Sequence, residues 1–215
     1  MTLTNKHIAY ENNCRQMFVG QTIRAVIYGE LKYYADEEDE NTNAEPYYQT
    51  KYADIDTLDY SIYFKTDDGK AIYVFWDNTF ISYGLQSEQL DFTENTNDYE
   101  QKWDVSTNNK WVDYIGQKIV DFKIIWEKTW SSNLYGTIKV YTKYPQTFEI
   151  TTENGKSIFI TAADLNDGKD EFCSQMDNLL VTTNLDLLKK LGANERQQIE
   201  IYKSKKSFWT KIFGH

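Results

Sequence analysis

Few side chains in this sequence are of the types that enzymes use to move protons or to hold metal ions. The two histidines are His7 and His215, and the two cysteines are Cys14 and Cys173. A histidine close to a chain end is expected to be solvated, so the sequence disfavours a histidine-based triad and most zinc sites. It contains no phosphate-binding loop, dinucleotide-binding fingerprint or HExxH motif. We therefore expect no catalytic residues, no metal and no cofactor, and a protein that is not an enzyme.

Carboxylates are abundant instead, with 33 Asp and Glu residues in a chain of 215. Two of them could act as an acid and base pair, as in glycosidases, but with so many acids the spacing of any pair is uninformative. The densest group of oxygen ligands is the segment DLNDGKDE at 164–171, which loosely resembles a calcium loop. Its glycine stands fifth rather than sixth, where an EF-hand requires it, so an acidic turn is the simpler interpretation. Calcium binding at this segment stays open.

Two acidic segments with interleaved aromatic residues are better candidates for recognition. One lies between residues 33 and 52, and the other in a connector at about 86–109. Carboxylates can steer a basic protein toward such a surface, and tyrosine or tryptophan rings can anchor it. A solvated loop is the alternative for both segments. The residues predicted to bind a partner are Asp36, Glu37, Glu38, Asp39, Glu40, Tyr47, Tyr48, Tyr99 and Trp103.

The overall charge points to the same kind of partner. The net charge is −10 and the isoelectric point is near 4.7. A negative field repels phosphate backbones, so we expect no binding to nucleic acid. The same field attracts a basic protein and speeds the encounter. An acidic surface that merely keeps the protein soluble is the alternative.

An internal repeat is the strongest pattern in the sequence. The segment FVGQTI at 18–23 matches YIGQKI at 114–119, and IYFKTDDGKAIYV at 62–74 matches FEITTENGKSIFI at 148–160. The first match is offset by 96 residues and the second by 86, a difference that the acidic insertion in the first copy accounts for. Two matches in the same order predict a duplicated unit.

Each matched block also predicts local structure. The dipeptides Asp68-Gly69 and Asn154-Gly155 predict tight hairpins, because type I′ turns need positive φ at both central positions. Apolar residues alternate on either side of each turn, as in strands with one buried face. Further strands are expected at 23–31, 80–83, 119–126 and 178–182, and helices at 8–18 and 185–191. The predicted fold class is β-rich α+β, with two tandem copies of a small antiparallel β unit and short flanking helices.

We divide the chain into three parts. Residues 1–105 form the first repeat unit, with the acidic insertion at about 35–52 and the connector, and residues 106–192 form the second. Residues 193–215 form a basic, aromatic tail in which apolar residues from Phe208 to Phe213 have the spacing of an amphipathic helix. We expect this tail to dock on the acidic body, and contact with an anionic membrane is the alternative.

The cellular compartment follows from what the first residues and the cysteines indicate. The first 30 residues hold no apolar run fit for a signal peptide, and no stretch approaches a membrane span. Two cysteines, one in each half, are expected to be free thiols of a reducing compartment. We therefore expect a cytoplasmic protein, although a signal removed beforehand would leave no trace in this sequence.

The Gly-Gln-x-Ile strand and the Gly-Lys-x-Ile hairpin, in an acidic and aromatic-rich chain, resemble elements of bacterial immunity proteins of polymorphic and contact-delivered toxin systems. The resemblance covers about half of the chain and carries over no active-site residue. It implies an inhibitor that neutralises a cognate toxin by occluding its active site, with a basic toxin domain as the partner. A carbohydrate- or small-ligand-binding β module is the alternative function. A carboxylate-dependent enzyme and a protein that works at membranes through its tail are further alternatives.

Overall fold

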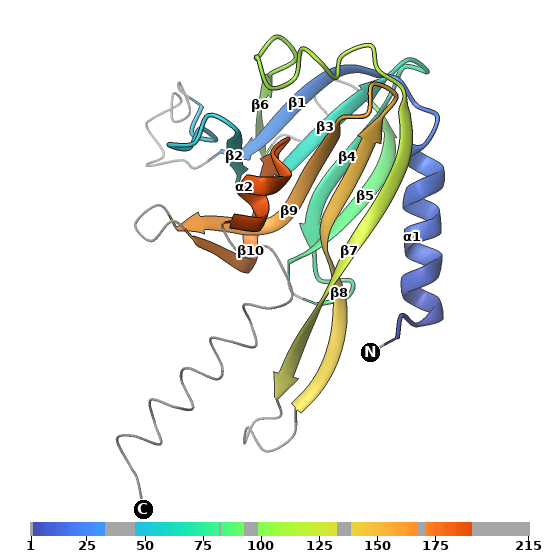
Figure 1. The fold of residues 1–215 in the computed structure, drawn as a ribbon, viewed down its shortest axis with the longest axis vertical. Helices are drawn as coiled ribbons and strands as arrows, with labels where there is room; N and C mark the ends of the chain where they lie inside the picture. The colour runs from blue at the N-terminus through green and yellow to red at the C-terminus, as the bar shows by residue number, and fades with distance from the viewer. Residues whose placement is uncertain are drawn as a thin grey trace, which may run out of the picture.

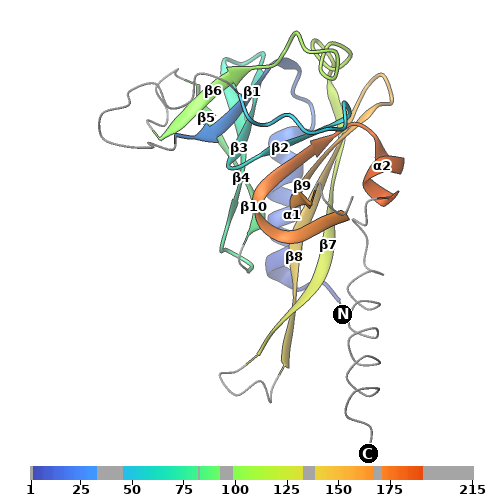
Figure 2. The same cartoon turned by 90° about the vertical axis from the view of Figure 1, so that its left-hand side faces the viewer.

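The computed structural model describes residues 2–32, 46–81, 83–92, 99–132, 139–166 and 171–190. Over these residues the chain forms two five-stranded antiparallel sheets that pack face to face, with one longer helix beside them (Figures 1 and 2). The β-rich, antiparallel architecture that the sequence predicts is confirmed. The acidic run at 36–40, residues 167–170 of the acidic segment 164–171 and the tail at 193–215 lie outside the described residues.

The first sheet has the strand order β5-β4-β3-β1-β6. Four of its strands form a meander in which each strand pairs with the next, and β6 adds to the free side of β1. Its strands are β1 (Ile23–Leu31), β3 (Ser61–Thr66), β4 (Lys70–Asp77), β5 (Gly84–Asp91) and β6 (Glu100–Asp104).

The second sheet has the order β2-β10-β9-β8-β7. Its last four strands form another meander, and β2 from the first part of the chain pairs with β10, so segments far apart in sequence share this sheet. Its strands are β2 (Ile55–Leu58), β7 (Ile119–Ser132), β8 (Lys139–Thr152), β9 (Ser157–Asn166) and β10 (Glu171–Thr182). The ends of β7 and β8 reach beyond the rest of the sandwich in Figure 1.

The core lies between the two sheets, where every second side chain of each strand points inward. Ile62 and Phe64 of β3 and Phe148 and Ile150 of β8 are fully buried in one shared apolar cluster, as their alternation predicts. Helix α1 (Asn5–Phe18) closes the open side next to β5 and β7 and adds Phe18 to this cluster. The helix predicted at 8–18 is therefore confirmed and begins three residues earlier.

The environment of His7 differs from the expectation that a histidine near the terminus is solvated. Its ring is buried in the first turn of α1, stacks on Phe80 and contacts Trp126 edge-on. Its Nε2 lies 3.1 Å from Lys143 O, and its Nδ1 accepts a hydrogen bond from the backbone N–H of Thr4. Since α1 packs along the sandwich, the start of the helix is pressed against β7 and β8, which buries the imidazole.

The two hairpin turns adopt one geometry, although not the predicted one. Gly69 and Gly155 have φ values of +79° and +77°, but neither Asp68 nor Asn154 has a positive φ, so the type I′ prediction is wrong. Instead, Oδ1 of Asp68 and of Asn154 accepts a hydrogen bond from the backbone N–H two residues further on. Such Asx turns need a left-handed residue at the glycine alone.

The two Gly-Gln segments meet in a symmetric junction. The N–H of Gly20 donates to Ile119 O at 2.9 Å, and the N–H of Gly116 donates to Ile23 O at 2.7 Å. At the offset of 96 residues, Gly20 corresponds to Gly116 and Ile23 to Ile119, so the two hydrogen bonds are equivalent. A register shift also follows Ile23 in β1 and Ile119 in β7. Duplication of one ancestral unit nevertheless stays a prediction, because shared geometry does not establish common origin.

Several strands differ in extent from the predicted ones. The connector expected at 86–109 holds most of β5 and all of β6, β7 runs on to Ser132, and β10 begins at Glu171 rather than near 178. Strand β5 lies at the edge of its sheet and carries exposed polar residues. Its amino-acid composition therefore resembles that of a loop, which is why the sequence predicts a connector there. The short helix α2 (Leu185–Lys190) agrees with the prediction at 185–191.

Cys14 and Cys173 are both free thiols, as expected. Burial raises the pKa of the Cys14 thiol, whose sulfur lies 3.3 Å from Ser87 Oγ. Within the described residues, no helix has the length and apolar character needed to cross a membrane.

Candidate functional site

Strand β1 ends with two polar residues on the face that packs toward the core. Tyr28 and Glu30 are both fully buried, since they continue the alternation that buries Val26. Across the ladder to β6, Tyr28 lies opposite Trp103 and Glu30 opposite Gln101. This end of β1 is therefore where the predicted partner-binding residues of the first insertion and of the connector can meet.

The Glu30 carboxyl has an incomplete set of partners. Its Oε2 accepts hydrogen bonds from Trp103 Nε1 at 2.6 Å and from the backbone N–H of Tyr47 at 3.4 Å. Its Oε1 is buried without a hydrogen-bond partner among the described residues. Burial raises the pKa of Glu30 to about 7, and the nearby carboxylates of Asp59 and Asp56 add to this rise, while the two hydrogen bonds oppose it. Near neutral pH the carboxyl therefore exchanges between its protonated and ionised forms.

Tyr47 and Tyr99 flank the same end of β1 and are exposed. The Tyr47 hydroxyl lies 2.8 Å from Leu31 O and 2.8 Å from Asp59 Oδ2, and the Asp59 carboxylate also accepts from the backbone N–H of Leu31. Tyr99 O accepts a hydrogen bond from the backbone N–H of Lys32 at 2.9 Å. The exposed fractions of Tyr47 and Tyr99 are 42% and 77%. These two predicted residues are thus placed where a partner could reach them.

Tyr48 and Trp103 have a different placement from the one predicted. Tyr48 is 6% exposed, and its ring packs edge-on against Tyr28 at a centroid distance of 4.9 Å. Because neighbouring residues point to opposite sides of the extended chain, Tyr47 faces outward and Tyr48 inward. Trp103 is half-buried, with its indole N–H committed to Glu30. Tyr48 therefore packs in the core, and Trp103 holds the Glu30 carboxyl. Neither ring is an exposed anchor for a partner.

The acidic run Asp36, Glu37, Glu38, Asp39 and Glu40 lies outside the described residues. The described residues on either side of that segment do lie at this end of β1. Lys32 follows the last residue of the strand, and Tyr47 is hydrogen-bonded to Leu31. The sequence between these two anchors carries the densest negative charge of the first half of the chain.

A second buried carboxylate, that of Glu100 in β6, lies on the outer face of the first sheet. Glu100 accepts hydrogen bonds from Ser61 Oγ at 2.9 Å, from Tyr73 OH at 3.2 Å and from Tyr63 OH. Burial and the Glu100 charge raise the pKa of both tyrosines, so these phenols stay protonated and donate. Since Glu100 directly follows Tyr99, this cluster restrains the backbone next to the exposed tyrosine.

Sequence reasoning missed a buried polar chain behind the site. Lys110 Nζ lies 2.7 Å from Asp56 Oδ2, which also accepts from Tyr28 OH at 2.7 Å, and that hydroxyl accepts from Trp111 Nε1 at 2.8 Å. Burial raises the pKa of Tyr28 and lowers the pKa of Lys110, with Asp56 opposing the latter shift. Tyr28 and Trp111 are separated by 83 residues, so no local pattern could have revealed this contact.

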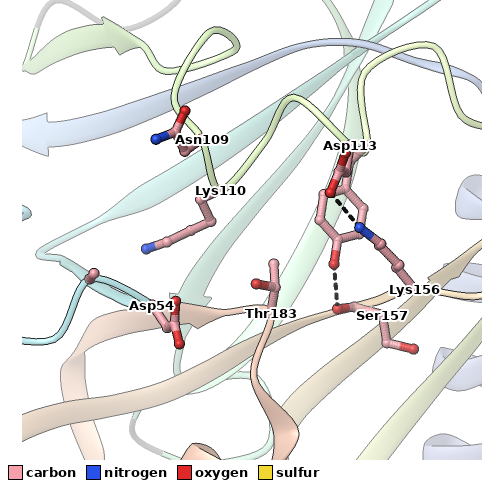
Figure 3. Close-up of a pocket in the computed structure, with 9 residues that line it drawn as sticks. Asp54, Asn109, Lys110, Asp113, Lys156, Ser157 and Thr183 are labelled. Carbon is pink, nitrogen blue, oxygen red and sulfur yellow. Dashed lines mark hydrogen bonds and ion pairs between the residues drawn. The ribbon is translucent and has the colours of Figure 1, made fainter.

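Lys110 also borders a hollow of about 470 Å³. In Figure 3 the Lys110 side chain points away from the ion pair between Asp113 and Lys156, which lies across the hollow. Nowhere in the described part of the chain do three or more His, Cys, Asp or Glu side chains gather in a way that could hold a metal ion.

No family model matches this chain, and neither a curated protein nor a solved structure matches it.

Proposed function

We propose that this protein is a protein-binding inhibitor of the immunity type, which binds a basic toxin domain and occludes its active site. The observation that carries the proposal is the convergence at the end of β1. Tyr47 from the first insertion and Tyr99 from the connector lie next to the same strand end and are exposed. Both were predicted from sequence segments that are about 50 residues apart.

The physical arrangement suits binding with little reorganisation. Tyrosine rings contribute large contact areas at a low cost in side-chain entropy, and they bind best when they are already held in place. The Tyr47 hydroxyl is hydrogen-bonded to the end of β1, and the backbone of Tyr99 is held by its hydrogen bond to Lys32 beside the Glu100 cluster. The net charge of −10 would speed the approach of a basic partner, and salt would weaken this effect.

The proposal includes the duplicated scaffold and the compartment. We infer two tandem copies, one contributing β1, β3, β4 and β5 and the other β7 to β10, supported by the matching meanders, register shifts and turn geometry. Two free thiols favour a cytoplasmic protein, where an immunity protein would meet an incoming toxin.

The test uses the tagged full chain as bait in cells of the source organism, at low and high ionic strength. We expect one stoichiometric basic protein that is released by salt, and whose toxic activity the purified chain blocks at equal concentration. The double variant Tyr47→Ala/Tyr99→Ala should lose at least tenfold in affinity, because buried aromatic anchors are the residues that dominate interface energies.

The matched control is Trp130→Ala/Tyr141→Ala. These two residues are also exposed, 43% and 45%, but lie on the extended β7–β8 hairpin. The control should bind the partner as the wild type does. If the hairpin variant loses the partner while the Tyr47/Tyr99 variant keeps it, the site is wrong. If the captured protein has no activity that this chain inhibits, the inhibitor function is wrong.

A further inference from the structure

The β7–β8 hairpin continues as a two-stranded ribbon beyond its pairing with β9. Strand β8 pairs with β9 from Thr147 to Thr151, whereas its pairing with β7 runs on to the pair Ser132–Lys139. The ribbon from Trp126 to Ser132 is therefore about 20 Å long, at about 3.3 Å a residue. Figures 1 and 2 show its end projecting beyond both sheets and beyond α1.

The charge of this ribbon differs from that of the whole chain. Residues 128–148 contain three lysines and no acid, in a chain whose net charge is −10. Lys128 and Lys143 lie directly opposite each other in the ladder, and like charges at such positions destabilise a sheet. Neither ammonium is paired with a carboxylate of the described residues. An anionic partner would supply the counter-charge.

Exposed aromatic rings lie on the same face of the ribbon as these lysines. Trp130 and Tyr141 form the next cross-strand pair on this face, and each is nearly half exposed. Lys128 Nζ lies 4.2 Å from the centre of the Tyr141 ring, so the lysine and the ring are in contact. On the opposite face, Val140 is 59% exposed. The end of the ribbon therefore presents apolar side chains on both faces.

From this arrangement we infer that the end of the ribbon binds the surface of a bilayer of anionic phospholipids. Tryptophan and tyrosine rings favour the headgroup level of a bilayer, because they are apolar with one polar group. Lysines are attracted to negatively charged headgroups. A ribbon that enters the headgroup layer by its end is covered on both faces, which accounts for the exposure of Val140 as well as of the rings.

A bilayer suits this ribbon better than a nucleic acid or an acidic protein does. A bound nucleic acid would lie along one face and leave Val140 uncovered, and it would come close to the acidic body of the protein. A bilayer touches only the projecting end. The ribbon's length of about 20 Å exceeds the Debye length of about 8 Å at physiological ionic strength, so the charge of the body is largely screened there.

The experiment mixes the full chain with large unilamellar vesicles of phosphatidylcholine alone or with added phosphatidylglycerol, and measures the bound fraction by cosedimentation. Binding to the phosphatidylglycerol vesicles should be stronger by about tenfold or more and should weaken as salt is added. Equal binding to both kinds of vesicle, or none to either, would overturn the inference. Binding to a single-stranded oligonucleotide without binding to vesicles would also overturn it.

Two double variants locate the contact on the ribbon. Trp130→Ala/Tyr141→Ala removes the rings, and Lys128→Gln/Lys143→Gln removes the charges. Each should weaken binding to phosphatidylglycerol vesicles by about tenfold or more. All four side chains lie outside the buried core, and far-UV circular dichroism shows that the variants fold. The basic tail at 193–215 is present in every variant, so a loss of binding in these two does not come from the tail.

Each double variant has a matched control. Tyr47→Ala/Tyr99→Ala removes exposed rings at the end of β1, and Lys70→Gln/Lys118→Gln removes exposed lysines at the start of β4 and directly before β7. Both controls should bind vesicles as the wild type does. Ribbon variants that keep wild-type binding, or controls that lose as much as they do, would refute the site. Inhibition of a toxin is measured in solution without lipid, so failure of either experiment leaves the other proposal standing.

Discussion

The Glu30 carboxyl makes the stability of this fold depend on pH in a direction opposite to that of most acidic residues. Burial holds its pKa at about 7 in the folded state, against an ordinary value of 4.5. The folded state therefore binds more protons than the unfolded state between these two values. Stability contributed by protonated Glu30 is present below pH 4.5, is lost as the pH rises toward 7, and stays lost above that.

Glu30→Gln should remove this dependence. An amide keeps the shape of the protonated acid but does not ionise, so the variant should gain stability relative to wild type as the pH rises from 4.5 to 8. The gain is up to about 3 kcal/mol for a shift of this size, measured by urea unfolding at both pH values. Glu88→Gln on the exposed part of β5 controls for loss of a negative charge. Parallel stability curves for wild type and Glu30→Gln would contradict the argument.

Gly29 shows how closely the buried Glu100 cluster is packed against β1. A Cβ atom at this position would overlap Ser61 Oγ and come within 3.0 Å of the Glu100 carboxyl carbon. Gly29→Ala should therefore destabilise the protein by about 1–3 kcal/mol, as overpacking does in cores, measured by urea unfolding. Gly29→Ala/Ser61→Ala removes the overlapping oxygen and should recover part of the loss. A double variant that is no more stable than Gly29→Ala would show that the overlap is not the cause.

At the scale of elements, the strands that follow a local rule could be predicted and the others could not. Alternation in β3 and β8 is a property of neighbouring residues, and it correctly identified their buried faces. The sequence of β5 and β6 predicts a connector instead, because edge strands with solvated residues lack the apolar pattern. The site depends on contacts such as Trp103 to Glu30, 73 residues apart, which tertiary packing alone decides.

The two hairpin turns should respond alike to the same substitution. Gly69 and Gly155 share a left-handed φ, and a Cβ at either position would meet no atom within 4 Å. The cost of Gly69→Ala and of Gly155→Ala is therefore conformational, about 1 kcal/mol each, and should agree within about 0.5 kcal/mol by thermal unfolding. Gly84→Ala offers a contrast, because Gly84 has no positive φ and its added Cβ would lie 3.3 Å from Pro145. A large difference between the two turn variants would show that the turns are not equivalent.

At the scale of the whole molecule, the two sheets depend on each other. Strand β2 comes from the first part of the chain but pairs with β10 of the second sheet, and the junction between the Gly-Gln segments links β1 to β7. Buried residues of both sheets and of α1 form one apolar cluster. Neither sheet buries its inner face without the other, so the described part of the chain should unfold as one cooperative unit.

Phe18 is the residue with which to test this cooperativity. Its ring is fully buried, stacks on Phe122 at 4.7 Å, and contacts Phe64 of the first sheet and Phe148 of the second edge-on, each at 6.3 Å. Phe18→Ala should cost about 3–5 kcal/mol, and Phe18→Leu clearly less, because leucine fills part of the cavity. Tryptophan fluorescence and far-UV circular dichroism should give one coincident urea transition in wild type and in both variants, shifted to lower urea in the variants. Two separated transitions, with Phe18→Ala moving one of them alone, would mean that the sheets fold independently, and the shared core would then contribute little to the stability of either.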